Sequence, residues 1–574
     1  MIMKRNSLSI LKFFNFYILA AAMMLASCSD MLDTDSDLVE FQEDNQLHSP
    51  TDSVYSVMGI IYKMQAIADR TVLLGEMRAD LVTPTEYANA DLKAIADFDI
   101  DGQNSYNQIS DYYAVINNCN YYLANIDTAL VKRGRKVFES EFAVVKTFRA
   151  WTYLQAALVY GTVPLVTEPL LTEKAAQEAM NGSYATLNDI CNYFINDLAP
   201  YVDTPLPQMG SIDGQDSRKF FIPVRVMLGE LCLWAGRYAE AAGYYHDYLT
   251  LRSKPITTGV SAARWRSTTN EFRDISYGFA SSVSSSSGSE CLAYIPMENR
   301  EFYGVYSQLT NVYSSTQRNN YYAQAVPSAA LKELSASQNY CMVFQASDTQ
   351  RDTLYAPKEN LLGENQEGDL RFCDSYSKRI VNQDQNSKYS AERHTVSKLN
   401  YNGVTLYRTN IVYLHFAEAL NRAGYPQSAF AVLKYGLYDQ AITEHIDSLE
   451  RVQAGSLLSF DVNVFNQQNT QGVHARGCGD ADADTLYVLP QPASALATRA
   501  DTVAWQQPLV EDLIVDELAL ETAFEGQRFY DLMRVALRRG DAAYLAAPVA
   551  KRDGTTDDVL YQKLLNQANW YLAK

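Results

Sequence analysis

The chain has 574 residues, a formal net charge of −19 at pH 7 and 47% hydrophobic residues. This hydrophobic content, with only 27 Gly and 17 Pro, is typical of a globular protein and argues against a disordered or collagen-like one. The acidic excess argues against nucleic-acid binding, because contacts to phosphates need clustered Lys and Arg. It also argues against electrostatic docking on anionic lipid.

Residues 1–27 have the order of features of a secretory signal peptide. A segment with three basic residues precedes an apolar run of about 13 residues, which small residues close. The run is shorter than the about 20 residues that a membrane-spanning helix needs. The Leu-Ala-Ser before Cys28 resembles the lipobox of bacterial lipoproteins, which predicts an acylated Cys28, an acidic tether over 28–50 and a mature charge of −22. The alternative is an ordinary signal peptide with an incidental Cys28.

Helical spacing of apolar residues dominates the rest of the chain. The expected helices cover about 54–68, 105–127, 136–160, 185–199 and, as the last strong one, 511–540.

Two further segments, 224–249 and 410–437, share one pattern: a helix, a short turn with Gly236 or Gly424, and a second helix with an Ala five positions after that Gly. The pattern resembles a tetratricopeptide helical hairpin, in which the small Ala lets the two helices approach closely. The helices 136–160 and 185–199 are candidates for another such pair. The fold class expected is therefore mostly α.

Residues 255–410 differ in composition from the rest of the chain. They are rich in Ser, Asn, Tyr and Gln and include short β-like pieces such as 291–297. Long irregular segments within a compact domain are more often functional than not. We therefore expect the ligand-binding part of the protein here.

Four motifs resemble those of one family, the RagB/SusD surface lipoproteins of Bacteroidetes. Acidic residues follow Cys28, and 145–170 contains an Arg-Ala, aromatic and Gly-x-Val-Pro-Leu-Val arrangement. The helix 408–424 and the segment 517–534, with its Glu-Gly-x-Arg-Phe-x-Asp-Leu-x-Arg sequence, are also similar to the family's. The segment after Ala429 lacks the family's usual Asn-x-Val-Arg-x-Arg. Residues 472–490 are more similar to the RagB side of the family than to the starch-binding side.

This resemblance implies a single SusD-like domain over 51–574. Its expected parts are an N-terminal helical part over about 51–254, a loop-rich binding part over about 255–410 and a C-terminal helical part over about 411–574. The resemblance implies a non-catalytic lipoprotein, anchored in the outer membrane and facing the exterior. It would capture oligosaccharide for import through a partner SusC-like TonB-dependent transporter.

Three other functions remain open. RagB-like proteins imply capture of peptides instead of glycans. A surface glycoside hydrolase using a carboxylate pair is a second alternative. A scaffold of tetratricopeptide-like hairpins without a ligand is the third.

The motifs of common catalytic and cofactor sites are absent from the sequence, and no cofactor is expected. The carboxylates of 517–534 could perform acid–base chemistry, but we interpret them as ion-paired, since charges on a buried helix need partners. Asp97, Asp99 and Asp101 match the first half of an EF-hand calcium loop, and they are weak candidates because Gln108 stands where a Glu is needed. The seven cysteines after Cys28 form no C-x-x-C pair and are interpreted as core residues.

Tyrosine is in excess, with 40 in the chain. A flat aromatic ring covers the C–H face of a sugar, while Asn, Gln and Arg reach its hydroxyls. The segment 299–322 interleaves both kinds of residue and is the best binding candidate. The alternative is that these rings pad loops against the helices. The candidate ligand-binding residues are Tyr87, Trp265, Tyr277, Arg300, Tyr303, Tyr306, Tyr313 and Tyr321.

Overall fold

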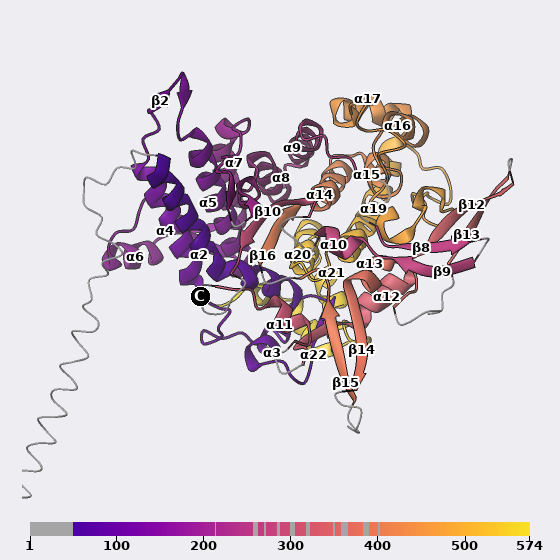
Figure 1. The fold of residues 1–574 in the computed structure, drawn as a ribbon, viewed down its shortest axis with the longest axis horizontal. Coiled ribbons are helices and arrows are strands. Elements are labelled where there is room, and N and C mark those ends of the chain that lie inside the picture. The colour runs from indigo at the N-terminus through magenta and orange to yellow at the C-terminus, as the bar shows by residue number, and fades with distance from the viewer. Residues whose placement is uncertain are drawn as a thin grey trace, which may run out of the picture. The chain divides into compact units, whose positions relative to one another are not determined.

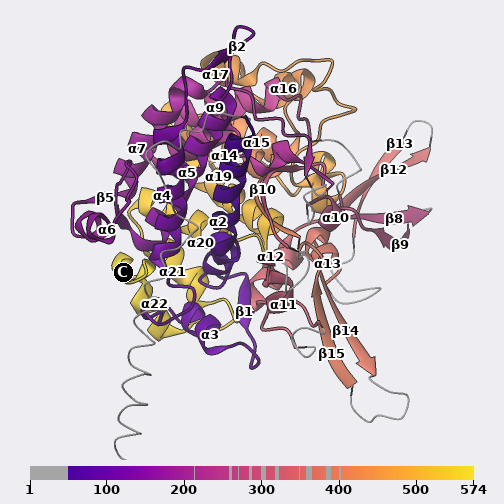
Figure 2. The same ribbon diagram turned by 60° about the vertical axis from the view of Figure 1, so that its left-hand side comes forward.

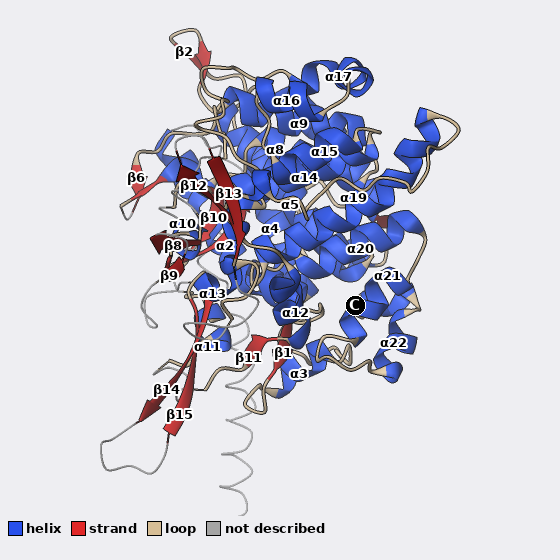
Figure 3. Ribbon diagram, turned by 90° about the vertical axis from the view of Figure 1, so that its right-hand side faces the viewer, coloured by secondary structure: helices blue, strands red, loops and turns tan. Residues whose placement is uncertain are grey.

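Helices make up one side of the computed structural model, and most strands lie on the other (Figures 1 and 3). Residues 49–574 form one compact unit. The structure describes 50–212, 214–256, 262–268, 271–283, 288–298, 305–316, 322–347, 350–356, 365–382, 390–399 and 402–574. The predicted signal peptide and the predicted acylation site Cys28 lie outside these residues. Within them, every helix is too short or too polar to cross a membrane.

Helices dominate the N-terminal half, and the longer ones pack side by side. The helices of this half before the first hairpin are α2 (Pro50–Glu76), α3 (Ala90–Ala96), α4 (Ile109–Asn125), α5 (Glu139–Tyr160), α6 (Glu173–Met180) and α7 (Leu187–Leu198). Helix α4 lies between α2 and α5, and α5 also packs on α7. Gly161, with a φ of +75°, ends α5, and a capping box of Thr186 and Asp189 begins α7. The predicted helices of this half are confirmed.

Two helical hairpins form the centre of the fold. The first consists of α8 (Val224–Trp234) and α9 (Tyr238–Leu251), and the second of α14 (Thr409–Arg422) and α15 (Pro426–Lys434). Gly236 and Gly424 turn each chain with a φ of +73° and +101°, which L side chains rarely adopt. Helix α14 packs on α9, so the hairpins are neighbours although they lie far apart in the sequence. The prediction of two tetratricopeptide-like hairpins is confirmed.

The remaining helices are short, with the exception of α19 and α20. They are α10 (Phe279–Val283), α11 (Leu309–Tyr313), α12 (Ala329–Ser337), α13 (Leu370–Ser375), α16 (Asp439–His445), α17 (Ser448–Ala454), α18 (Ala475–Cys478), α19 (Arg499–Thr522), α20 (Arg528–Arg539), α21 (Ala543–Ala550) and α22 (Asp558–Leu564).

The prediction of one continuous helix over 511–540 is wrong, because α19 ends at Thr522 and α20 begins at Arg528. Phe524 and Gly526 between them have φ values of +71° and +83°, which no α-helix contains. The Gly526 N–H donates to Glu76 Oε1 at 2.8 Å. A Cβ on Gly75 would lie 1.8 Å from the Gly526 oxygen, so this turn packs backbone to backbone against α2. The break between α19 and α20 therefore depends on this contact with α2, which the helical spacing of apolar residues does not predict.

The strands of the described residues form two-stranded antiparallel pairs. These are β1 (Val82–Pro84) with β11 (Ala325–Pro327), β2 (Val131–Lys132) with β3 (Arg135–Lys136), β4 (Thr162–Pro164) with β5 (Tyr184–Thr186), β6 (Ser211–Ile212) with β7 (Gln215–Asp216), β8 (Arg264–Thr268) with β9 (Glu271–Ser276), β10 (Cys291–Pro296) with β16 (Gly403–Arg408), β12 (Cys341–Ser347) with β13 (Gln350–Tyr355), and β14 (Tyr376–Asn382) with β15 (Ser390–Val396). The hairpins β8–β9, β12–β13 and β14–β15 project from the helical body (Figures 1 and 2). The region expected to be irregular is therefore partly built of hairpins.

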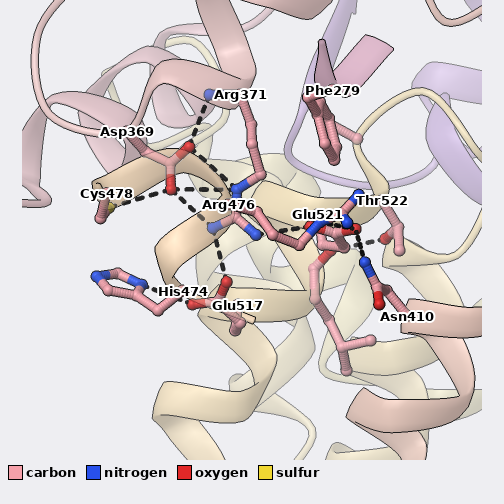
Figure 4. A network of polar contacts seen from close by, with 12 residues as sticks. Phe279, Asp369, Arg371, Asn410, His474, Arg476, Cys478, Glu517, Glu521 and Thr522 are labelled. Atoms are coloured by element: carbon pink, nitrogen blue, oxygen red, sulfur yellow. Dashed lines mark hydrogen bonds and ion pairs between the residues drawn. The ribbon is translucent and has the colours of Figure 1, made fainter. Parts of the chain in front are cut away.

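A buried charge network joins four segments of the chain around Glu521 (Figure 4). The Glu521 oxygens lie 2.7 Å from Arg371 Nη1, 2.6 Å from Arg408 Nη1 and 3.2 Å from Arg476 Nε. Burial raises the pKa of the Glu521 carboxyl, but the three guanidiniums outweigh it and hold the pKa well below its usual range. Glu521 is therefore a permanent anion that fixes helices α13, α14, α18 and α19 to one another.

The other charges of the C-terminal motif are also paired. The predicted ion pairing is confirmed, although the partners are distant in sequence. They are Lys398 for Glu525 at 2.7 Å, Asp80 for Arg528 at 2.7 Å, and Glu418 for Arg534 at 2.6 Å.

Replacing Arg408 should show how much this network stabilises the fold. In Arg408→Met the fully buried Glu521 loses one of its three cations, and Glu525 loses the guanidinium that lies 2.7 Å away. We expect the free energy of unfolding, measured by urea denaturation, to fall by about 3–5 kcal/mol. The matched control is Lys174→Met, which removes an exposed Lys174–Glu178 pair and should change stability by less than about 0.5 kcal/mol. Equal effects of the two substitutions would contradict this role.

Glu76 makes the stability depend on pH. Burial raises its pKa from 4.5 to about 8; the nearby carboxylates Glu525 and Asp80 add to the rise, and the Gly526 N–H and Lys398 limit it. The folded-state pKa exceeds the unfolded one, so the stability from protonated Glu76 is complete below pH 4.5. This stability is lost as the pH rises through 8.

The variant Glu76→Gln should remove this loss. We expect it to exceed the wild type in unfolding free energy at pH 9 by roughly 2–4 kcal/mol, and by much less at pH 5. Thermal or urea unfolding across this pH range measures the difference. The control variant is Glu173→Gln, at an exposed position in the first turn of α6. Parallel curves for Glu76→Gln and wild type would refute the assignment.

Candidate ligand-binding site

A short two-stranded pairing brings two distant loops together at one surface. Strands β1 and β11 pair in the register Val82↔Pro327 to Pro84↔Ala325. Just beyond them, the Thr85 N–H donates to the Gln324 carbonyl at 2.8 Å. The loop after β1, residues 85–89, therefore lies beside the segment 322–324 that precedes β11.

Two tyrosine rings from these segments stack on each other at the surface. The ring centroids of Tyr87 and Tyr322 lie 4.1 Å apart at an interplanar angle of 21°. The two residues are 50% and 46% exposed. Large aromatic surface left in water on a paired, fixed platform is a feature of recognition sites more than of solvent-facing loops. We call Tyr87 and Tyr322 the tyrosine pair.

Polar groups frame the tyrosine pair on the side of α3. The Asn89 N–H donates to Gln324 Oε1 at 3.1 Å, and Asn89 Oδ1 accepts from the Leu92 N–H at 2.8 Å, which caps α3. The Tyr87 hydroxyl donates to the Glu86 carboxylate, which raises the pKa of that phenol above its usual value. Tyr87 thus stays a neutral phenol across physiological pH, with its hydroxyl oriented by Glu86.

Through Asp69, helix α2 holds residues 307–308, which lie just before α11. The Asp69 carboxylate accepts from Ser307 Oγ at 2.7 Å and from the Gln308 N–H at 2.6 Å, at the start of α11. The segment that contains Tyr322 is bonded to α11 in turn, because the Gln324 N–H donates to the Val312 carbonyl at 2.7 Å. Burial raises the pKa of Asp69 to about 6, and the two hydrogen bonds limit the rise. The site is therefore anchored to the helical body and not only to a loop.

Sequence comparison finds no match, among either family models or curated proteins. The fold, in contrast, matches solved structures. A SusD superfamily protein from Bacteroides vulgatus has a TM-score of 0.55 and 14% identity, covering 90% of this chain and 92% of its own. A SusD superfamily protein from Bacteroides fragilis has a TM-score of 0.53 and 15% identity, covering 90% and 95%. This chain has the SusD-like fold.

A third solved structure with the SusD-like fold is described as a carbohydrate-binding protein, also from Bacteroides fragilis. It has a TM-score of 0.52 and 14% identity, covering 86% of this chain and 88% of its own. These matches confirm the mostly α, SusD-like architecture predicted from the sequence motifs.

The other candidate residues occupy different places in the SusD-like fold. Trp265 is 3% exposed and packs with Phe272 and Tyr340, while Tyr313 is fully buried against Phe524. Tyr277 is 59% exposed at the end of β9, on a separate surface element. Tyr306 is partly buried one residue before Ser307. The candidates Arg300, Tyr303 and Tyr321 lie outside the described residues.

Sequence reasoning did not single out Asn89, Gln324 or Glu86, and it placed Tyr322 among many similar tyrosines. The residues are brought together by the β1–β11 pairing and by the Thr85 hydroxyl, which donates to the Ala323 carbonyl 238 positions away. Each of the two strands has only three residues and contains a proline, so neither shows the alternation of apolar and polar residues that would predict a strand.

The weak calcium candidates are each engaged in protein contacts. Asp97 lies 3.7 Å from Arg552, Asp99 forms an ion pair with Lys563, and Asp101 Oδ1 accepts the N–H of Gln103 at 2.9 Å. Across the described residues, their oxygens do not gather as a set of metal ligands.

One other group could in principle hold a metal ion. Asp369, His474 and Cys478 are buried, with one ligand atom of each within 4.8 Å of the others (Figure 4). The Arg371 guanidinium already donates to both Asp369 oxygens at 2.7–3.2 Å. Burial raises the pKa of the Cys478 thiol well above its usual value, and Asp369 adds to the rise. A divalent cation would have to displace a buried guanidinium, so this cluster fits an internal hydrogen-bond network better than a metal site.

His415 is equally part of the core. It is 2% exposed, and its Nδ1 lies 2.9 Å from Glu230 Oε2. Burial lowers its pKa, but Glu230 outweighs burial and the pKa is raised overall. His415 is therefore a packed residue of the core.

Proposed function

We propose that this protein is a non-catalytic RagB/SusD-family lipoprotein that captures oligosaccharide at the cell surface. The observation that carries the proposal is the tyrosine pair, exposed and framed by Asn89, Gln324 and Glu86, on a SusD-like fold. The carbohydrate-binding protein from Bacteroides fragilis supports a glycan as the ligand class.

The chemistry of the tyrosine pair suits a sugar ring. The exposed ring faces supply an apolar plane for the C–H face of a pyranose, and rigid tyrosines lose little conformational entropy on binding. The amides of Asn89 and Gln324, and the carboxylate of Glu86, supply donors and acceptors for hydroxyls at the edge.

The route of delivery rests on the N-terminal sequence and on the family resemblance. Acylation at Cys28 would hold the protein in the outer membrane, facing the exterior, and two or more acyl chains anchor stably. The partner proposed is a SusC-like TonB-dependent transporter, which would import the captured oligosaccharide.

The absence of catalysis is also part of the proposal, and the contacts of the C-terminal motif support it. Glu521 and Asp531 are buried and Glu525 is partly buried, and all three are paired with Arg or Lys, which does not suit a solvent-accessible acid–base pair.

Substituting the tyrosine pair tests the proposal directly. We expect Tyr87→Ala and Tyr322→Ala each to weaken binding of a glycan selected on a glycan array by at least about tenfold, or about 1.4 kcal/mol. Isothermal titration calorimetry measures the affinity. Tyr62→Ala on α2 is the matched control, because Tyr62 is also exposed, at 56%, but lies away from the pair. Loss of binding in the control alone would refute the site.

The same preparation separates the alternatives. Binding on a peptide array without any on the glycan array would favour peptide capture. Hydrolysis of a bound glycan by the pure protein would contradict the non-catalytic role. Failure to recover a TonB-dependent transporter in a pull-down from the native membrane would contradict the proposed partner.

A further inference from the structure

A cavity of about 470 Å³, lined by both polar and apolar groups, lies at the junction of the two helical hairpins. Its walls come from residues 253–256 that follow α9, residues 289–290, the first residues of α14 and the segment 463–476. The volume falls within the range of small-molecule sites. None of its lining residues belongs to the tyrosine pair or its polar frame, so it is a separate site.

One wall carries an ammonium group without a partner. The Lys254 Nζ makes no hydrogen bond or ion pair with any described residue. Burial lowers its pKa, the positive charges of Lys219 and Arg252 lower it further, and the negative charge of Glu290 offsets only part of the shift. A local excess of cations is unexpected in a chain with a net charge of −19. A bound anion would relieve both the burial and the repulsion.

The opposite wall is electrically balanced and rigid. Glu290 lies 2.7 Å from Arg476 and 3.4 Å from Arg408, so two guanidiniums offset the repulsion that its carboxylate would exert on an anion. No side chain caps the N-terminus of the 14-residue helix α14, which begins with Thr409 at this wall. The helix dipole therefore adds positive potential there.

The backbone on the Lys254 side is fixed as well. The Tyr413 hydroxyl donates to the Lys254 carbonyl, and the Gln471 N–H donates to the Ile256 carbonyl at 3.0 Å. The site is thus held in place before any ligand arrives, which lowers the entropic cost of binding.

The remaining lining is suited to a hydroxyl-rich molecule. Ser253, Ser289, Asn463 and Asn469 offer neutral donors and acceptors, and Val464 offers apolar surface. We propose that this cavity binds a small hydroxyl-rich acid of the hexuronic type, with its carboxylate at Lys254 and its hydroxyls at the Ser and Asn side chains. The proposal does not depend on oligosaccharide binding at the tyrosine pair.

Titration calorimetry with D-glucuronate and D-glucose tests this assignment on the full chain. We expect glucuronate to bind at least about tenfold more tightly than glucose, because a hydrogen bond to a charged group contributes more than a neutral one. Lys254→Met should weaken glucuronate binding by at least about tenfold. Asn469→Ala, at an exposed position, should weaken it by a smaller factor.

Two controls make the result specific to the cavity. Lys174→Met removes a positive charge from the surface of α6 and should leave glucuronate binding unchanged. Tyr87→Ala should also leave it unchanged, which separates this site from the tyrosine pair. Equal binding of glucose and glucuronate, no binding of glucuronate by folded wild type, or unchanged affinity in Lys254→Met would each overturn the proposal.

Discussion

The fold depends on the burial of one carboxylate, Glu521, among the guanidiniums of Arg371, Arg408 and Arg476. Removing these charges from water costs free energy that only close, complete pairing offsets. Each guanidinium comes from a different segment, so the pairing is satisfied only when α13, α14, α18 and α19 meet correctly. Arg408 is also the last residue of β16, the partner of β10, and directly precedes α14, which links the strand pair to the central hairpins.

Helix α2 transmits this arrangement to the tyrosine pair. At its C-terminal end, Glu76 receives the Gly526 N–H of the turn that follows α19, and Gly75 permits the two backbones to touch. Two turns earlier, Asp69 holds the start of α11 through Ser307 and Gln308. The buried network and the surface loops are thus connected through a single rigid helix, which explains how an exposed aromatic pair is held in a defined geometry.

The two proposed sites use different physics. The tyrosine pair lies on the surface and offers flat apolar faces with polar groups at the edge, which suits an extended oligosaccharide. The cavity beside Lys254 offers a positive, pre-formed pocket that suits a single small acid. The strongly acidic composition makes the second site distinctive, because long-range repulsion of anions must be overcome locally by fixed cations and a helix dipole.

The sequence by itself determined the helices, the two hairpins with Gly236 and Gly424, and the ion pairing of the C-terminal charges. Periodicity, turn glycines and the cost of burying a charge are local or universal constraints, so they can be recognised along a single chain. Only the tertiary structure decided that α19 ends at Thr522, that Tyr313 is fully buried while Tyr322 stacks on Tyr87, and that Arg528 pairs with Asp80. These outcomes depend on contacts between residues hundreds of positions apart, and such contacts leave no periodic pattern in the sequence.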